Sequence, residues 1–404
     1  MSGQQRAVWT ARGLCGLLVL IAGTLAACGN GRAPPFERAV SQATDDLFDQ
    51  TQEVPALLAR LERSLGKKST GPMSQIVIDP MLDTSTGQQT TATTLLEKRV
   101  VERTQAKFAQ FEFLPFHPSH LSKAEYLLTG TMTRVRSEGA HRVLRINLAL
   151  TDLRSGLVLA QASGLADDKD IDTTPLRYYS DSPVLIKDKV IEGYARTTAS
   201  PAGIKADAHY LARIAASAKI KEATALYNAE RYQEALGQYR EALATPEGEQ
   251  LRTLSGIYVS NVKLGRLADA EKAFAQVVAL GFAYNELGVK FLFNAGSTEF
   301  WSDARISGAY AMWLRQIARE SVNANACLEV LGHTSRSGTP GANETLSLRR
   351  AAYVRQRLIG EAPVLGPRTR ALGMGYQHNI VGSGTDNSID VLDRRVEFKI
   401  IACH

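Results

Sequence analysis

The sequence of 404 residues predicts a multidomain α+β protein with an N-terminal α/β sandwich, a central pair of α-helical repeats and a C-terminal βαβαβ domain. Three observations predict this class. Strand-like runs alternate with helical runs in the first half, a helical pattern occurs twice in the middle, and strands and helices alternate again at the end. The length is sufficient for two or three hydrophobic cores.

Residues 1–27 have the composition of a secretory signal. Arg6 and Arg12 precede the apolar run "LCGLLVLIAGTLAAC", which is short for a membrane span, and polar residues follow. The order of an aliphatic residue, two small residues and Cys28 resembles the bacterial lipobox, which implies that Cys28 carries lipid. Gly29 stands where an Asp would resemble an inner-membrane retention signal. The resemblance therefore implies a lipid anchor in the outer membrane with periplasmic domains, and the alternative is an ordinary signal peptide cleaved near Ala27.

Residues 28–36 read as a tether, and residues 37–200 as an α/β domain. The pattern predicts a helix at "RAVSQATDDLFDQTQ", a second helix that opens at Pro55, strands at "QIVIDPML" and "FEFLPF", and a helix between these strands. Apolar residues alternate along "HRVLRINLALTD", the period of a half-buried strand. We expect one sheet with helices on one face. The segments "AEYLLTGTM" and "LALTDLRSGLVLAQAS" resemble the periplasmic domain of the lipoproteins CsgG, LpoB and FlgO, which implies interaction with an envelope protein.

Residues 201–284 contain an internal repeat. The segment "ERYQEALGQYREALA" recurs 35 residues later as "GRLADAEKAFAQVVA", which aligns Ala235 with Ala270 and Tyr239 with Phe274. The period and the small-then-aromatic spacing resemble tetratricopeptide repeats, in which paired helices pack through the small residue. Two units bury little core by themselves. Two interpretations of this region therefore remain: a peptide-binding groove, or a helical connector docked on its neighbours.

Residues 285–404 carry the most specific pattern. "VKFLFNAGSTEFW" and "CLEVLGHTSRSG" read as strands with their loops, helices follow each of them, and "DRRVEFKIIAC" reads as the closing strand. The order, together with "LSLRRA" and "DRRVEF" at their expected separation, resembles the OmpA C-terminal domain. The resemblance implies a peptidoglycan-binding module.

The same resemblance implies a site for the diaminopimelate of peptidoglycan. In that family an acidic residue after the loop Thr accepts the ligand ammonium, and an Arg at the start of the next helix pairs with the ligand carboxylate. Arg350 matches this Arg, Asn343 matches the loop Asn, and Arg394 matches the first Arg of the closing motif, where it can also pair with a local carboxylate. Ser335 occupies the position of the acid.

The hydroxyl of Ser335 cannot balance an ammonium charge. Hydrogen bonds to charged groups contribute roughly 1.5–3 kcal/mol against about 1 kcal/mol for neutral ones, so the departure predicts about tenfold or more weaker binding. Asp386, Asp390 and Asp393 are candidate replacement anions if their loop folds inward. From the sequence alone, Ser335→Asp is expected to strengthen binding to the wall.

Cys327 and Cys403 are the two cysteines that remain beyond the signal and Cys28. They stand at the start of one predicted strand and the end of another. Antiparallel pairing of these strands would bring the two residues together, and an oxidising compartment favours a disulfide. The alternative is two buried thiols.

Several function classes lack support in the sequence. The net charge of +6 is mild for this length, and no dense basic stripe with interleaved aromatic residues indicates nucleic acid. No H-E-x-x-H zinc motif, G-x-S-x-G elbow or complete phosphate loop occurs. We therefore expect no catalytic residues, metal or cofactor. Two functions remain: a lipoprotein that links the outer membrane to peptidoglycan and scaffolds envelope proteins, or a regulatory or assembly lipoprotein, such as a synthase activator or a secretion or flagellar accessory, with a degenerate wall module.

Overall fold

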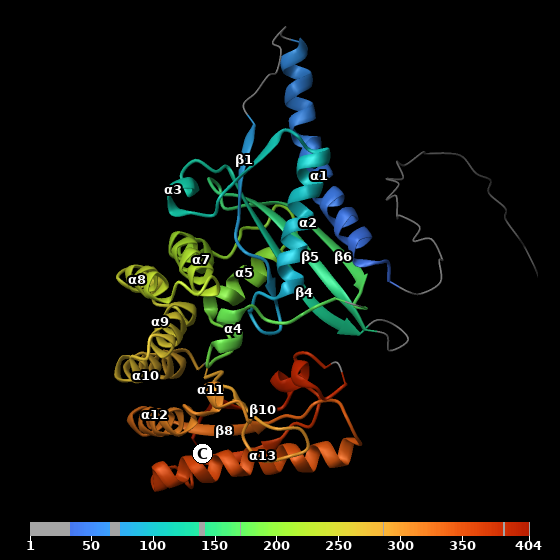
Figure 1. The fold of residues 1–404 in the computed structure, drawn as a ribbon. Helices are drawn as coiled ribbons and strands as arrows, with labels where there is room; N and C mark the ends of the chain where they lie inside the picture. Colours follow the sequence, from blue (N-terminus) through green and yellow to red (C-terminus); the bar gives the residue numbers. More distant parts are fainter. Residues whose placement is uncertain are drawn as a thin grey trace, which may run out of the picture. The chain divides into compact units, whose positions relative to one another are not determined.

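The computed structural model describes residues 33–64, 73–136, 142–169, 171–285, 287–382 and 384–403. The predicted signal, Cys28 and most of the tether lie outside these residues. By its contacts, the chain from residue 33 onward is one unit, and the predicted boundaries after residues 200 and 284 fall between its helices and strands (Figure 1). Each helix in the described ranges is too short or too polar to span a lipid bilayer.

The N-terminal part contains a mixed six-stranded sheet. Its order is β3-β1-β4-β5-β6, and the short β2 pairs with β4. The first three strands in this order are parallel to one another, whereas β4, β5 and β6 form an antiparallel meander. The strand bounds are β1 Ser74–Ile78, β2 Leu82–Asp83, β3 Phe111–Leu114, β4 Tyr126–Arg136, β5 Arg142–Asp152 and β6 Val158–Asp167.

Helices cover both faces of this sheet. On one face α1 packs against β5 and β6, and α2 packs against α1. On the other face α5 packs against β4 and β5. Ile76 and Ile78 belong to the core beneath α1 and α2, whereas Val77 belongs to the core that contains Tyr194 of α5. The expectation of helices on one face was wrong, because the continuous apolar run of β1 buries both of its sides.

The helix α1 also differs from the prediction, since it runs without a break through Pro55. Of the other helices before the middle of the chain, α3, α4 and α6 are short. The bounds of this group are α1 Phe36–Ser64, α2 Thr91–Lys107, α3 Pro118–Leu121, α4 Arg177–Asp181, α5 Lys189–Ala199 and α6 Ala208–Leu211.

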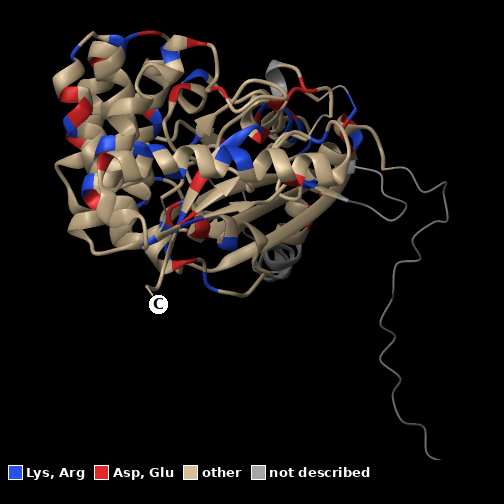
Figure 2. Ribbon diagram, turned by 90° about the horizontal axis from the view of Figure 1, so that it is seen from below, with Lys and Arg blue, Asp and Glu red and all other residues tan. Residues whose placement is uncertain are grey.

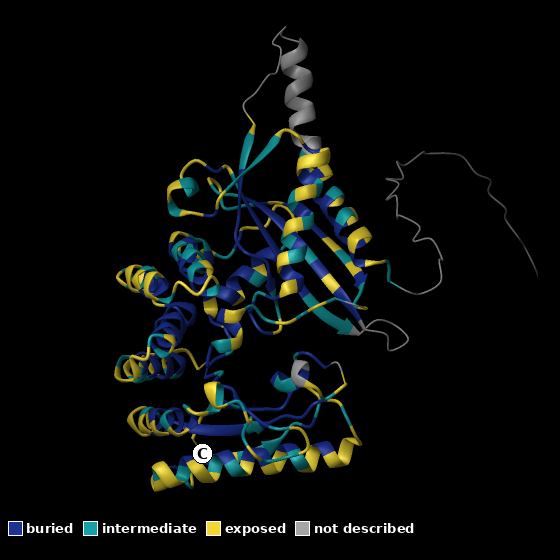
Figure 3. Ribbon diagram, viewed as in Figure 1, coloured by how far each residue is buried: buried dark blue, intermediate teal, exposed yellow. Residues whose placement is uncertain are grey.

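Four helices form the middle of the chain, and each packs against the next. Ala235, Tyr239, Ala270 and Phe274 are all buried, as their place in the repeat predicts. The helix α9 is buried along most of its length (Figure 3). The likeness to tetratricopeptide repeats stays a prediction. The bounds are α7 Ile214–Asn228, α8 Tyr232–Leu243, α9 Leu251–Lys263 and α10 Leu267–Tyr284, with a 3-10 turn, η1, at Pro246–Gly248.

Neighbouring segments cover both ends of this short helical stack. Tyr178 of α4 stacks on Tyr239, with ring centroids 6.0 Å apart. At the other end Trp313 of α12 stacks on Phe274, with centroids 5.3 Å apart, and donates its Nε1–H to the Tyr258 hydroxyl at 2.9 Å. Two repeats therefore share their core with the α/β part and with the C-terminal part.

The C-terminal part contains a four-stranded sheet in the order β7-β10-β8-β9. Strand β10 is antiparallel to β7 and β8, and β9 is parallel to β8. The sequence prediction missed β9. This strand follows α13 in the sequence, precedes the closing strand β10, and forms the edge of the sheet next to β8. The bounds are β7 Phe291–Leu292, α11 Ala304–Ser307, α12 Tyr310–Asn323, β8 Cys327–Gly332, α13 Pro340–Glu361, η2 Pro363–Leu365, β9 Thr369–Gly373, η3 Ser388–Asp393 and β10 Arg395–Ile401.

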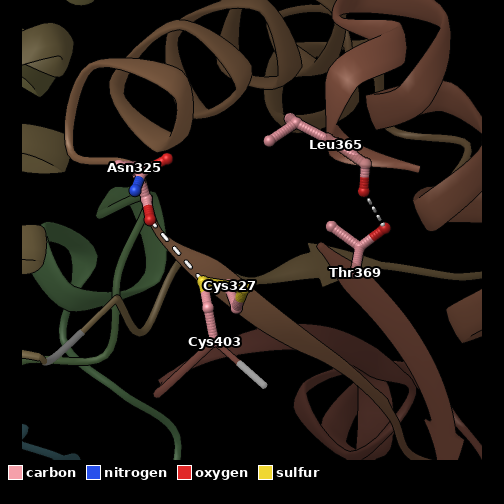
Figure 4. Close-up of a disulfide and its surroundings, with 5 residues drawn as sticks. All are labelled: Asn325, Cys327, Leu365, Thr369 and Cys403. Atoms are coloured by element: carbon pink, nitrogen blue, oxygen red, sulfur yellow. Dashed lines mark hydrogen bonds between the residues drawn. A yellow bond between two sulfur atoms is a disulfide. The ribbon is translucent and has the colours of Figure 1, made fainter. Parts of the chain in front are cut away.

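A disulfide joins Cys327 to Cys403 (Figure 4). The antiparallel register sets Cys327 opposite Ile401, two residues before Cys403, so the start of β8 and the segment after β10 meet. The predicted disulfide is confirmed, and the alternative of two buried thiols does not hold. Nearby, the Thr369 hydroxyl donates to the Leu365 carbonyl at 2.8 Å, which fixes the turn into β9.

Candidate functional site

The loop between β8 and α13 approaches the helix closely. A Cβ atom at Gly332 would lie 1.9 Å from the Ser347 carbonyl oxygen, so the absence of a side chain lets β8 pass beneath α13. His333, Thr334 and Ser335 are buried, whereas Arg336 is exposed. The loop thus directs the side chain of Ser335 inward and that of the following residue outward.

Asn343 holds this loop in place. Its Nδ2 donates to the carbonyl oxygens of Ser337 and Thr339 at 2.6 and 3.1 Å. Thr339 caps α13, and Gly338 has a φ of +82°, a conformation that favours glycine. Asn343, a predicted site residue, therefore stabilises the conformation of the loop between β8 and α13.

Arg350 is fully buried within the C-terminal part. Its guanidinium donates to three backbone carbonyl oxygens, those of Ser297 at 2.9 Å, His333 at 3.0 Å and Asn294 at 2.8 Å. Burial, with the nearby charge of Arg394, lowers the pKa of Arg350 to about 10. With none of its surface exposed, Arg350 joins the turn after β7 to the end of β8 and does not face solvent.

Arg394 is also buried, and it contacts the loop that precedes β10. Its Nε donates to the Phe293 carbonyl oxygen at 3.1 Å, and its Nη1 donates to Asp386 Oδ1 at 2.8 Å and to the Asn387 carbonyl oxygen at 3.0 Å. The guanidinium lies 5.5 Å from the centre of the Trp301 ring. The sequence left open whether Arg394 pairs with a local carboxylate. In the structure it does, and its partner is Asp386.

Asp386 reaches the position that the sequence leaves without an acid. Its Oδ1 accepts the Ser335 hydroxyl at 2.6 Å and Arg394 Nη1 at 2.8 Å. Partial burial disfavours its charge, but these two donors hold the pKa of the carboxyl below its ordinary value. About a quarter of the Asp386 side chain, 24%, is exposed, against 2% for Arg394. The site therefore presents an ionised carboxylate to solvent beside Ser335.

The other two candidate anions shape the loop instead. Asp393 is buried and accepts the backbone N–H groups of residues 380, 381 and 382, and burial raises its pKa. Asp390 is buried too, and it accepts the backbone N–H of Asp386 at 2.9 Å. Of the three, only Asp386 is hydrogen-bonded to Ser335 within the described residues.

A largely buried cluster of His333, Arg395 and Glu397, which the sequence analysis missed, lies next to the loop. His333 Nε2 is 3.1 Å from Glu397 Oε1, and Arg395 donates to Glu397 as well. Burial and the charge of Arg395 lower the pKa of His333 to about 4, so this imidazole is neutral at pH 7. One signal in the sequence could have indicated the ion pair of this cluster, since Arg395 and Glu397 share one face of a strand at spacing two.

Charge over the described elements is mixed, with Lys and Arg interspersed among Asp and Glu (Figure 2). The local environment of Ser335 differs from this background. There Arg394 pairs with the ionised carboxylate of Asp386, and the charges of both residues act on the pKa of Arg350.

Comparison with known proteins finds partial likenesses. No family model matches the chain. The outer membrane porin F of Pseudomonas aeruginosa is 33% identical over 130 residues, which cover 32% of this chain. The chain thus spans about a third, 33%, of the length of that curated relative.

Solved structures give likenesses of similar extent. The crystal structure of the peptidoglycan-associated lipoprotein from Burkholderia pseudomallei is 21% identical, with a TM-score of 0.24, and the match covers 28% of this chain and 89% of that one. The periplasmic domain of Helicobacter pylori MotB (residues 78–256) is 18% identical, with a TM-score of 0.23, and the match covers 28% of this chain and 71% of that one.

Proposed function

We propose that this protein is an outer-membrane lipoprotein that binds peptidoglycan non-covalently through residues 285–404 and presents its N-terminal and helical parts to envelope proteins. The observation that carries the proposal is the carboxylate of Asp386 beside the hydroxyl of Ser335, 2.6 Å apart. It supplies the negative charge that the motif lacks. The partial likeness to an outer membrane porin supports the same compartment.

The environment of Asp386 suits an ammonium ligand. The carboxyl is ionised at neutral pH, is partly exposed and is held by two hydrogen bonds, so little side-chain freedom is lost when a ligand binds. Bonds between ionised groups are shorter and about twice as strong as neutral ones. The diaminopimelate ammonium is therefore a chemically matched ligand for this position.

Sedimentation with purified sacculi tests the proposal. The full chain in detergent should pellet with sacculi at moderate salt, and a soluble stem peptide that contains diaminopimelate should release it. Competition is needed because the chain is basic, with a pI near 9.1, and any basic protein adheres to an anionic wall. A chain that stays in the supernatant at every sacculus concentration would leave the regulatory or assembly role as the better explanation.

The lipid anchor gives an independent expected result. Cys28→Ser should abolish incorporation of a palmitate analogue and leave an unprocessed or a soluble periplasmic protein, because acylation needs the thiol of Cys28. The measurement is metabolic labelling followed by fractionation, with Cys15→Ser as the matched control. Equal labelling of the Cys28→Ser variant and the unaltered protein would remove the lipoprotein assignment.

A further inference from the structure

We infer that the α/β part controls wall binding, because Arg134 of β4 holds the loop that carries Asp386 in its binding conformation. This loop consists of residues 374–394, between β9 and β10, and is here called the Asp386 loop. The inference rests on the proposed wall-binding function. It adds a positioning residue from the N-terminal half of the chain and makes the site depend on the docking of the loop.

Arg134 joins the α/β part to the Asp386 loop. Its Nη1 donates to the Val381 carbonyl oxygen at 2.5 Å, and its Nε lies 3.1 Å from Asp168 Oδ2. The Arg134 side chain is 19% exposed, so most of it is covered by the two parts that it joins. The carboxylate of Asp168 fixes the direction of the guanidinium, because turning away would break a charged hydrogen bond.

Apolar side chains pack the loop against the sheet at the same place. Val381 and Leu392 of the loop line a cavity of about 20 Å³ together with Met132 and Leu144 of the sheet. All four residues are buried. A cavity of this size holds about one water molecule, so the loop and the sheet lie close together. The bond from Arg134 to Val381 therefore lies beside a largely dry contact, where a hydrogen bond is stronger than it is in water.

A short series of hydrogen bonds connects Val381 to Asp386. The backbone N–H groups of Val381 and Gly382 donate to the carboxylate of Asp393 at 3.0 and 2.5 Å. The next residue, Arg394, donates to Asp386 Oδ1 at 2.8 Å. Asp393 thus joins the part of the loop that the α/β part holds to the part that orients the carboxylate of Asp386.

Two other contacts hold the loop within the C-terminal part itself. The Asn379 side chain donates to the Thr334 carbonyl oxygen at 2.8 Å, and Arg395 Nη1 donates to the His378 carbonyl oxygen at 3.3 Å. These contacts persist when the bond from Arg134 is lost. Removal of Arg134 should therefore loosen the loop around residues 380–382 without unfolding the C-terminal part.

The size of the effect follows from the type of bond that is lost. A hydrogen bond from a charged donor shifts a conformational equilibrium about tenfold or more. The apparent affinity for a ligand falls in proportion to the fraction of molecules whose loop is docked. The coupling is reciprocal, so a ligand at Asp386 should in turn stabilise the contact between the loop and β4.

A double-mutant cycle tests whether Arg134 acts through Asp386. Sedimentation with sacculi is measured for the full chain in detergent, as the unaltered protein, Arg134→Gln, Asp386→Asn and the double variant. The matched control is Arg145→Gln, which removes an exposed arginine from the neighbouring strand β5, whose side chain forms no ion pair with any described residue. Unchanged circular dichroism confirms that each variant is folded.

Arg134→Gln should weaken binding to sacculi about tenfold, whereas Arg145→Gln should bind as the unaltered protein does. In the Asp386→Asn background Arg134→Gln should have a much smaller effect, because docked and undocked loops then differ only by a neutral hydrogen bond to the ligand. Equal losses from Arg134→Gln in both backgrounds, or equal losses in Arg134→Gln and Arg145→Gln, would mean that Arg134 does not act through Asp386, and the inference would be wrong.

Hydrogen–deuterium exchange observes the loop directly. In Arg134→Gln the backbone N–H groups of residues 380–382 should exchange faster than in the unaltered protein, and Arg145→Gln should leave them unchanged. A soluble stem tetrapeptide that contains diaminopimelate should slow exchange in residues 133–136 of the unaltered protein and not in Arg134→Gln. Identical exchange of residues 380–382 with and without Arg134 would show that this residue does not hold the loop.

Failure of the two proposals is distinguishable. A chain that pellets with sacculi equally well with and without Arg134 overturns this inference and leaves wall binding intact. A chain that does not pellet with sacculi in any variant and is not protected by the tetrapeptide overturns both.

Discussion

Asp386→Asn should weaken binding to sacculi about ten- to hundredfold, because it exchanges a charged hydrogen bond to the ligand ammonium for a neutral one. The asparagine keeps an oxygen that can accept from Ser335 and Arg394, so the loop should hold its shape. Since the pKa of Asp386 is below its ordinary value, its contribution should not change between pH 8 and pH 5. The measurement is sedimentation at several sacculus concentrations.

Glu344→Gln is the matched control. It removes an exposed carboxylate from the first turns of α13, and the Glu344 side chain forms no ion pair with any described residue, so binding should not change. Equal losses in Glu344→Gln and Asp386→Asn would indicate a general effect of net charge and would contradict a specific role for Asp386.

The position of Asp386 also decides whether Ser335→Asp strengthens or weakens binding to sacculi. The sequence alone predicts stronger binding, but the Ser335 hydroxyl lies 2.6 Å from Asp386 Oδ1, so a second carboxylate there would repel the first. We now expect Ser335→Asp to weaken binding, and Ser335→Asp with Asp386→Ser to bind more tightly than either single variant. A single Ser335→Asp variant that binds better than the unaltered protein would show that Asp386 is not the ammonium partner.

Removing the disulfide with Cys327→Ser and Cys403→Ser should lower the stability of the C-terminal part by about 4 kcal/mol. The crosslink spans a sequence separation of 76 residues, and chain-entropy arguments give a stabilisation of this size for loops of that length. The serines keep nearly the same volume, so packing at the partly exposed end of β10 should change little. The loss comes mainly from the greater freedom of the unfolded chain.

Tryptophan fluorescence during denaturation measures this effect in one part of the protein. Beyond the predicted signal, Trp301 and Trp313 are the tryptophans of the sequence, and both belong to residues 285–404. The unaltered protein in reductant should lose the same stability as the double variant, and the double variant should not respond to reductant. A transition that is identical in all four conditions would show that the disulfide contributes no stability.

The sequence by itself predicted the helices of the C-terminal part, its strands other than β9, and a possible pairing of Cys327 with Cys403. These predictions follow from local information, because hydrophobic periodicity sets helix or strand, and antiparallel order sets which strand ends meet. The repeat likewise placed Ala235 and Phe274 in the core of the middle helices. Strand β9 escaped prediction because it is short and lies at a sheet edge, where little alternation is required.

Only the tertiary structure decided how the site is built. Three aspartates in one loop are equivalent in sequence, and Asp386 alone reaches Ser335 because Asp393 and Asp390 hold the loop through backbone N–H groups. Arg350 matches a ligand-binding motif, yet carbonyl oxygens from 17 to 56 residues away enclose it. Such contacts depend on how segments that are distant in sequence pack together. The residues next to Arg350 in the sequence do not indicate which hydrogen-bond partners will surround it in the fold.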